Sequence, residues 1–209
     1  MLQVATIAPG TLGLLKRIQA LPELKKMRLV GGTALALLLG HRKSVDLDFF
    51  GEWDKRLDLL KLLSTVCDNA LALSKSTHGN LQFFLMDNVK VDIVNLPHEW
   101  LSPPVEEEGL RLASLRDIAA MKLEAINNRG LKRDFVDLAV LLEHFTLSEM
   151  LDFYKQKYAD PTPFSVLRSL AYFLDAEKED MPVMLVSLTW EQTKKRIQDA
   201  LQKITNKPL

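Results

Sequence analysis

The chain has 209 residues, 47% of them hydrophobic, which is enough to bury a core as one domain or as two small packed units. Its 27 basic and 27 acidic residues give a formal net charge of zero, so no overall field draws it to nucleic acid or to a membrane surface. The one cysteine, Cys67, excludes a disulfide framework within the chain and is typical of a reducing cytoplasm. No apolar run approaches the length that crosses a bilayer and the N-terminus lacks a signal-peptide pattern, so we expect a cytoplasmic protein without membrane contact.

The first predicted elements lead to a glycine bend. Leucine and isoleucine at helical spacing predict a helix over residues 11–24, and residues 28–30 predict a short strand. An apolar run over 34–39 predicts a second helix, and Gly31-Gly32-Thr33 lies between strand and helix. Glycine lets the backbone approach a phosphate closely, and exposed amides at a helix start bind anions. The bend is therefore a candidate phosphate-binding turn.

Residues 45–50 alternate with the period of a strand. Val45, Leu47 and Phe49 fall on one side, whereas Asp46 and Asp48 fall on the other. A strand here would present both carboxylates on one face, and two carboxylates plus phosphate oxygens suit Mg²⁺.

Each of these two motifs has an ordinary alternative. A Gly-Gly-Thr segment is most often only a turn, and an Asp-x-Asp pair is most often a solvated strand edge. Their conjunction, with Arg42 and Ser44 between them, is far more restrictive. It predicts a phosphate-binding turn that faces a metal-binding aspartate pair.

A helix over 54–67 is followed by three predicted strands, 69–75, 80–86 and 89–95, and Asp87-Asn88 forms a hairpin turn between the last two. Asp92 lies on the more polar face of the third strand. If that strand neighbours residues 45–50, Asp92 adds a third carboxylate; the alternative is an isolated charge on a solvated face.

Residues 97–109 contain two adjacent prolines and three adjacent glutamates, which predict a loop. We place a domain boundary there, with a mixed α/β half over 1–109 and a helical half over 110–209. A helix over 114–129 starts with a Ser-x-x-Asp cap and carries Lys122 and Arg129 on one stripe. A cation on an apolar stripe needs a partner, which is either a structural carboxylate or a triphosphate.

The next predicted helix, 132–143, has Asp134 and Asp137 near its start, where negative charge is favoured. These residues form either a cap and an ion pair with Lys122 or Arg129, or part of an active site. Further helices are predicted over 148–158, 163–175 and 189–204. The last carries a basic face, which is either solvated or an RNA contact, and consists of Lys194, Lys195, Arg196 and Lys203.

The order strand, Gly-Gly-Thr, helix, Asp-x-Asp resembles the nucleotidyltransferase superfamily related to DNA polymerase beta. The chain is more closely similar to the AbiEii/AbiGii toxin family, from about residue 30 to residue 142. That family has a Lys-Leu-x-Ala…Arg helix followed by an Arg-Asp…Asp helix. Here these are Lys122-Leu123-Glu124-Ala125…Arg129 and Arg133-Asp134…Asp137.

The resemblance implies an α+β fold: a small mixed β-sheet nucleotidyltransferase core with flanking helices, then an all-helical half that completes the active-site cleft. It implies Mg²⁺, with Mn²⁺ as an alternative, bound by Asp46, Asp48 and Asp92. It implies that Lys122 binds nucleotide phosphates, that Asp134 completes the site, and that Asp92 is a metal ligand or the general base. The implied catalytic residues are Asp46, Asp48, Asp92, Lys122 and Asp134, and the substrate-binding residues are Gly31, Gly32, Thr33, Arg42, Ser44 and Arg129.

The activity implied is transfer of NMP from an NTP to an acceptor, with tRNA as a candidate, by a toxin of a toxin-antitoxin or phage-defence system. A cognate antitoxin would then be a partner. Two alternatives stay open at this point. One is a catalytically inactive nucleotide- or partner-binding protein of the same fold, and the other is a nucleotidyltransferase that modifies a small molecule such as an antibiotic.

Overall fold

A computed structural model describes residues 1–77, 80–95, 98–158 and 163–205 of the chain. The chain divides into two compact units. The first, called the sheet unit below, consists of Met1–Glu99 and Pro103–Ala113, and the second, the helical unit, of Trp100–Ser102 and Ser114–Leu209. Among the described residues, no helix combines the length and the apolar character needed to span a membrane.

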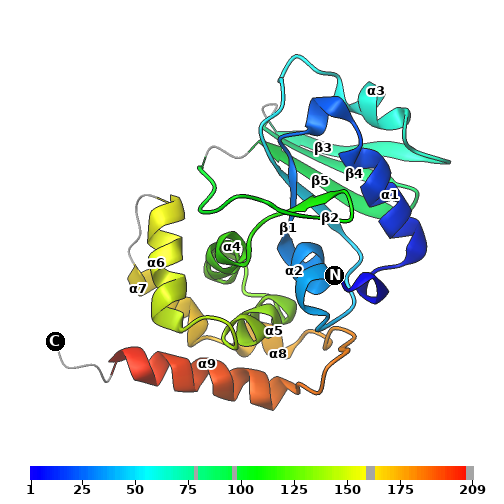
Figure 1. Cartoon of the computed structure of the whole chain (residues 1–209). Helices are drawn as coiled ribbons and strands as arrows, with labels where there is room; N and C mark the ends of the chain where they lie inside the picture. The colour runs from blue at the N-terminus through cyan, green and yellow to red at the C-terminus, as the bar shows by residue number, and fades with distance from the viewer. Residues whose placement is uncertain (78–79, 96–97, 159–162, 206–209) are drawn as a thin grey trace. The chain divides into compact units, whose positions relative to one another are not determined.

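The sheet unit is built on a seven-stranded mixed sheet of order β3-β4-β5-β2-β1-β7-β6. Figure 1 labels the strands β1 to β5 of this sheet. The pairs β1–β7 and β2–β5 are parallel and the others are antiparallel. This mixed sheet, followed by helices, confirms the predicted α+β class. The strands are β1 (Arg28–Val30), β2 (Leu47–Gly51), β3 (Leu71–Thr77), β4 (Leu81–Met86), β5 (Val89–Asn95), β6 (Val105–Glu107) and β7 (Leu110–Leu112).

One face of the central strands is core. Leu47 and Phe49 of β2 and Val91 and Ile93 of β5 are all fully buried. Since successive side chains of a strand alternate between faces, Asp48 and Asp92 leave the opposite face. The predicted strand over 45–50 begins two residues later than expected, and Val45, which was expected to point inward, is 66% exposed.

The predicted hairpin between β4 and β5 is confirmed. Asp87 and Asn88 form its two-residue turn, and both have positive φ, 50° and 65°. This is the type I′ geometry whose twist matches that of the flanking strands, and Asp and Asn tolerate it better than other non-glycine residues.

The sheet unit also carries short helices: η1 (Val4–Thr6), α1 (Pro9–Gln19), η2 (Pro22–Leu24), α2 (Gly31–Leu39) and α3 (Leu59–Ser64). The helix predicted over 11–24 is divided into α1 and η2, because Pro22 disfavours helical backbone at Leu21. The helix predicted over 54–67 is shorter: α3 begins after Asp58, whose carboxylate accepts a hydrogen bond from the Lys61 amide.

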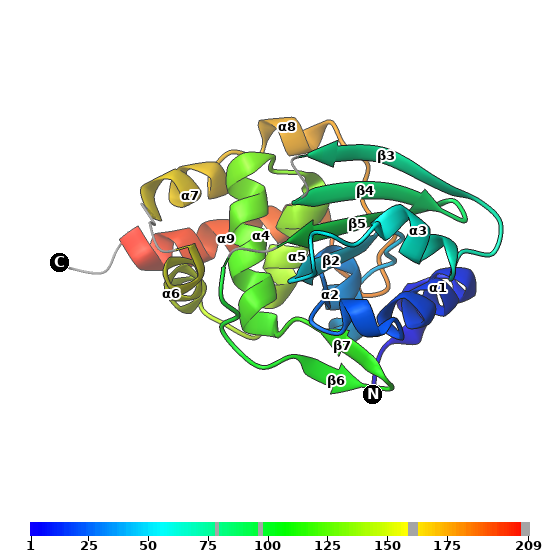
Figure 2. The same ribbon diagram turned by 90° about the horizontal axis from the view of Figure 1, so that it is seen from above.

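The helical unit contains α4 (Leu115–Asn128), α5 (Lys132–Leu141), α6 (Leu147–Tyr158), α7 (Pro163–Leu170), α8 (Leu174–Glu177) and α9 (Trp190–Thr205) (Figure 2). Helix α4 packs against α5, α6 and α7, and α9 packs against α5 and α6. The predicted cap is present, since the Asp117 amide donates to Ser114 Oγ over 3.1 Å. Gly130, with φ of +54°, ends this helix as expected.

Two sequence predictions at the boundary between the units are wrong. The segment 97–109, expected to be a loop, contains β6, and the segment from 110 onward, expected to be helical, begins with β7. These three-residue strands are too short to give a period in the sequence; β7 pairs with its neighbour β6 and also with the distant β1. Pro97 lies outside the described residues.

Candidate functional site

The Gly-Gly-Thr segment forms the first turn of α2 rather than a bend before it. Val30 is the N-cap in extended conformation, and Gly31 has φ of +68°. The first amides of a helix have no acceptor within the helix and point outward from its positive end. Gly31 and Gly32 are half-buried, so their backbone is accessible to an anion.

The Asp48 carboxylate packs directly on Gly31. A Cβ atom at residue 31 would lie 2.7 Å from Asp48 Oδ2, closer than any side chain allows. In β2, Asp48 is opposite Val30 of β1, the residue just before that glycine. The glycine thus provides both the left-handed backbone and the space for the carboxylate.

Thr33 and Ser44 fix the loop that leads to the aspartates. Thr33 is 1% exposed, and its hydroxyl donates to the main-chain oxygen of Asp46 and lies 2.8 Å from Ser44 Oγ. These two side chains were expected to contact substrate. The Thr33 hydroxyl is instead engaged within the protein, where it ties the loop before β2 to the start of α2.

Arg42 is also buried, although it was expected at the rim of a cleft. It is 4% exposed, and its guanidinium donates to the main-chain oxygen of Lys43 over 2.9 Å. The same loop is held to the N-terminal segment, because the Ser44 amide donates to the main-chain oxygen of Thr6 over 2.9 Å.

Asp48 and Asp92 are neighbours in the sheet. They are register partners in the parallel pair β2–β5, so their side chains leave the same face of adjacent strands. Asp48 is half-buried and Asp92 is 8% exposed. The conditional prediction that β5 lies beside the Asp-x-Asp strand is therefore confirmed.

A lysine that the sequence did not single out lies among these carboxylates. Lys90 Nζ is 2.8 Å from Asp92 Oδ2. Partial burial by itself would lower the pKa of Lys90. The hydrogen bond to Asp92 and the negative charges of Asp92, Asp48 and Asp46 outweigh burial, so the pKa of Lys90 is raised. All three aspartates are thus close enough to act on one amine.

The residues present fit a two-carboxylate magnesium site. Asp48 and Asp92 offer oxygen ligands from adjacent strands, and Asp46 is two residues from Asp48. Across residues 1–77, 80–95, 98–158 and 163–205, no group of three or more His, Cys, Asp or Glu side chains is arranged to bind a metal ion. Mg²⁺ commonly uses one or two carboxylates and completes its shell with water and substrate phosphates, so two in-register carboxylates suffice.

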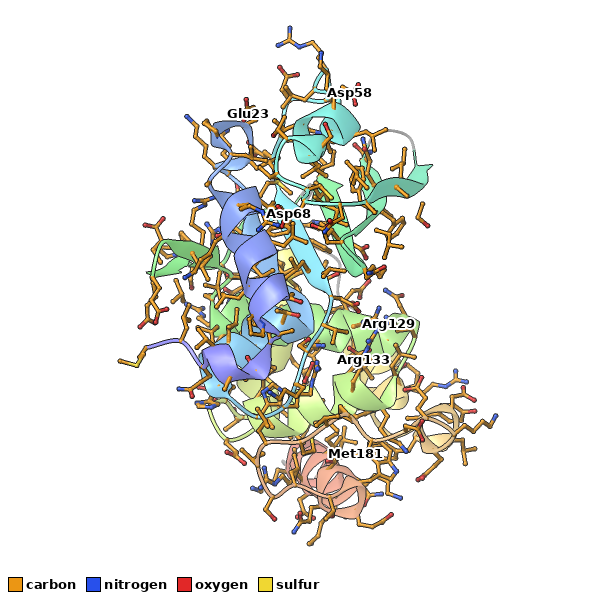
Figure 3. All side chains as sticks on the ribbon, turned by 90° about the vertical axis from the view of Figure 1, so that its right-hand side faces the viewer. Glu23, Asp58, Asp68, Arg129, Arg133 and Met181 are labelled. Carbon is orange, nitrogen blue, oxygen red and sulfur yellow. The ribbon has the colours of Figure 1, made fainter. Side chains whose placement is uncertain are left out.

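A second charged cluster is buried in the helical unit. Lys122 of α4 donates to Asp134 Oδ1 over 2.9 Å and also pairs with Asp137, and both carboxylates are fully buried. Arg129 Nε donates to Asp134 Oδ2 over 3.0 Å, while its own side chain is 52% exposed. Arg129 and Arg133, labelled in Figure 3, come from the end of α4 and the start of α5.

This cluster keeps Asp134 ionised. Burial by itself would raise the pKa of Asp134, but the charges of Lys122 and Arg129 and the hydrogen bonds from both outweigh burial and lower it. The ion-pair alternative inferred from the sequence is therefore present. A role in binding phosphates stays a prediction.

The helical unit also has a cavity of about 760 Å³ that the sequence did not indicate. Arg129 and Arg168 line it together with Phe164 and Tyr172, which are 71% and 51% exposed. Phe164 lies at the start of α7 and Tyr172 lies after its end, so the sequence alone does not distinguish these exposed rings from core residues.

The basic face of α9 is largely neutralised by acidic neighbours. Lys194 pairs with Glu177 and Glu191, and Lys195 pairs with Asp199. Arg196 pairs with Glu143. This face therefore gives little support to the RNA contact considered from the sequence.

Comparison with known proteins agrees with this geometry. Residues 13–206 match the family model described as "Nucleotidyl transferase AbiEii toxin, Type IV TA system". A protein of Aquifex aeolicus (strain VF5), described as uncharacterized, is 31% identical over 169 residues, which cover 79% of this chain and 82% of the relative.

Two solved structures share the fold. The crystal structure of JHP933 from Helicobacter pylori has a TM-score of 0.59 and 23% identity, covering 95% of this chain and 93% of that chain. MenT4, a nucleotidyltransferase toxin of Mycobacterium tuberculosis H37Rv, has a TM-score of 0.54 and 15% identity, covering 94% of this chain and 82% of that chain. At these identities the likeness extends to the fold alone.

Proposed function

Since the chain belongs to the AbiEii family of nucleotidyltransferase toxins and is a nucleotidyltransferase, we propose that it transfers NMP from an NTP to tRNA with Mg²⁺. The observation that carries the proposal is the pairing of Asp48 with Asp92 across β2–β5, beside the glycine start of α2. Carboxylates for a metal and helix amides for phosphates thereby come together within the sheet unit.

The aspartates would bind the metal ion and accept the proton of the acceptor hydroxyl. Asp48 together with Asp46 or Asp92 would supply two oxygen ligands, and Asp92, where it is not a ligand, would accept the proton of the acceptor hydroxyl. When bound, Mg²⁺ would neutralise phosphate charge and activate the acceptor oxygen. The acceptor oxygen attacks the α-phosphorus, pyrophosphate leaves, and the proton passes to the carboxylate.

The start of α2 would bind the β- and γ-phosphates. The amides of Gly32 and Thr33 belong to the first turn, where the helix dipole favours an anion. The Thr33 hydroxyl and Ser44 would keep the Asp46 loop against this turn, so their contribution is to position a ligand rather than to contact the nucleotide.

In the helical unit, the two cations of the Asp134 cluster would have different roles. Arg129 is half exposed and is the candidate for phosphate contact, whereas the Lys122 side chain is 5% exposed and holds Asp134 and Asp137. Arg129 also lines the cavity with Arg168 and Tyr172, and guanidinium groups beside exposed aromatic rings suit an RNA segment with unstacked bases. This supports tRNA as the acceptor.

The test is incubation of the purified protein with each α-labelled NTP, total tRNA and MgCl₂, followed by measurement of label in RNA. The Asp46→Asn and Asp48→Asn variants should each lose about 100-fold or more of the incorporation rate, because each removes charge from the metal site. Asp152→Asn is the matched control. Asp152 is an exposed carboxylate on α6, and its ion pair with Lys155 is long, 3.6 Å.

Each contrary result has a defined meaning. Label incorporation that is unaffected by Asp46→Asn and Asp48→Asn would overturn the mechanism. Binding of NTP with no release of pyrophosphate for any acceptor would favour a binding protein. If a small molecule is labelled in place of RNA, then that molecule and not tRNA is the acceptor, and the nucleotidyl-transfer reaction is the same.

A further inference from the structure

Lys90 is placed across the proposed metal site. It lies in β5 two residues before Asp92, so both side chains leave the same face of the strand. Its Nζ is 2.8 Å from Asp92 Oδ2, and its side chain is 50% exposed while that of Asp92 is 11% exposed. The carboxylate is therefore fixed in the sheet, and the amine reaches it from the solvent side.

The neighbouring strand guides this amine. Phe83 of β4 is the register partner of Asp92, and Lys90 Nζ lies 5.6 Å from the centre of the Phe83 ring. An amine over an aromatic face is attracted by the ring, which favours the conformer directed at Asp92.

The charges around Lys90 are those that a divalent ion would use. Asp92 accepts a hydrogen bond from the Lys90 amine, and Asp48 is the register partner of Asp92 on β2. A lysine amine and a divalent cation placed on the same carboxylates repel each other, whereas either one alone neutralises them.

We propose that Lys90 is an internal cation that competes with the divalent metal for Asp92, so that metal entry requires the amine to release this carboxylate. The inference rests on the proposed function, because the metal site is part of it. In the metal-free protein the amine forms an ion pair with Asp92. When metal binds, the flexible lysine side chain turns to solvent or to a nucleotide phosphate.

The competition predicts that removal of the Lys90 charge raises the affinity for the metal and lowers the stability of the metal-free protein. Lys90→Met removes the competing charge and keeps the apolar length of the side chain. It should tighten binding of Mn²⁺, a probe that takes the same oxygen ligands as Mg²⁺, by about tenfold. It should also lower the melting temperature of the metal-free protein. At saturating metal, the difference in melting temperature between the variant and the unmodified protein should be smaller.

The experiment is titration with MnCl₂, followed by the electron paramagnetic resonance signal of free Mn²⁺, with MgCl₂ as competitor. Lys90→Arg keeps the charge and should bind Mn²⁺ nearly as the unmodified protein does. Lys26→Met is the matched control, because Lys26 forms an exposed pair with Glu52 over 2.8 Å, beyond the other end of β2. Its affinity for Mn²⁺ should be unchanged.

The outcomes separate this inference from the proposed function. Metal binding by the unmodified protein that is unchanged or weakened in Lys90→Met would overturn the inference alone. Absence of metal binding in both proteins would overturn the proposed metal site together with the inference.

Discussion

At the scale of single residues, Gly31 is the position where a methyl group should do the most damage. Gly31 has φ of +68°, and a Cβ atom added there would lie 2.7 Å from Asp48 Oδ2. Gly31→Ala must therefore displace the carboxylate or the start of α2. The backbone strain is about 1–3 kcal/mol. We expect a large loss of nucleotidyl transfer with a smaller loss of stability, measured by label incorporation and by urea unfolding.

Gly10→Ala is the control for that change. Gly10 lies in α1 and a Cβ there meets no atom within 4 Å, so alanine should be neutral or slightly stabilising. Equal activity in the two variants would contradict the account of Gly31.

Lys122 is the residue whose loss should most destabilise the helical unit. Lys122→Met leaves the buried carboxylates of Asp134 and Asp137 without their shared cation. Breaking a buried ion pair in this way costs about 3–5 kcal/mol, measurable as a lower urea midpoint.

The exposed pair Lys155–Asp152, with 3.6 Å between charged atoms, provides the comparison. Lys155→Met should cost at most about 0.5 kcal/mol, since surface pairs in a helix contribute little. If Lys122→Met were equally mild, the cluster would not be the stabilising element that its burial indicates.

At the scale of elements, the β4–β5 hairpin is anchored through its turn. The Asp87 carboxylate accepts hydrogen bonds from the amides of Asp68, Asn69 and Ala70, over 3.0, 2.8 and 3.2 Å. These amide hydrogen bonds hold the pKa of Asp87 well below its usual range. The turn thus fastens the segment that precedes β3.

A lowered carboxyl pKa fixes the direction of the pH effect. The stabilisation is present above the unfolded-state pKa, about 3.9, and is lost as the pH falls below it toward the folded-state pKa. Asp87→Asn keeps the turn-forming tendency but removes the charge. We expect it to lower stability at pH 7 and to weaken the dependence of the unfolding free energy on pH below 4, followed by urea melts; an unaltered dependence would contradict this.

Elements with a long period or a turn signal were predictable, and short ones were not. The alternation in β5 and the Asp87-Asn88 turn located the hairpin from the sequence. Strand β7 has three residues and pairs with the equally short β6 and, about eighty residues away, with β1, so the sequence offers no alternation long enough to predict it. The early start of strand 45–50 was wrong because Val45 has strand propensity but no partner strand to bury it.

The sequence predicted which residues lie near the candidate site, but it predicted less well which of them are accessible to a ligand. Alternation put Asp48 and Asp92 on polar strand faces, and the fold then made them neighbours. The burial of Arg42 and of the Thr33 hydroxyl depends on tertiary packing around the loop. Lys90 was passed over because a lysine on a polar strand face is normally solvated, and its partner becomes evident only with the side chains in place.

At the scale of the whole molecule, the units are interleaved in sequence, because Trp100–Ser102 belongs to the helical unit while the residues on both sides belong to the sheet unit. The Leu101 amide donates to the buried Asp117 Oδ1 over 2.9 Å, and Lys157 Nζ lies 4.6 Å from the centre of the Trp100 ring. Lys157 and Asp117 are themselves a fully buried pair, 2.8 Å apart.

This arrangement predicts a unit-specific effect of Trp100→Ala. Loss of the ring removes the cation–π contact and apolar burial, about 1–3 kcal/mol. We expect faster hydrogen exchange for amides of α4 and α6 and little change in β4 and β5. Trp53→Ala, at a buried tryptophan of the sheet unit, should show the reverse pattern. Equal acceleration throughout both units would contradict the division.

The interleaving also bears on how the protein is made. Trp100 is synthesised well before Lys157, whose ammonium group lies over its ring, and the 57 residues from position 101 to position 157 take about 3–11 s to synthesise. During that interval the strands of the sheet unit can be completed up to Ala113, while the Trp100 ring has not yet met its partner Lys157 in α6. A nascent chain stalled before position 157 should therefore offer chaperones more of this indole than the finished protein, in which Trp100 is half-buried.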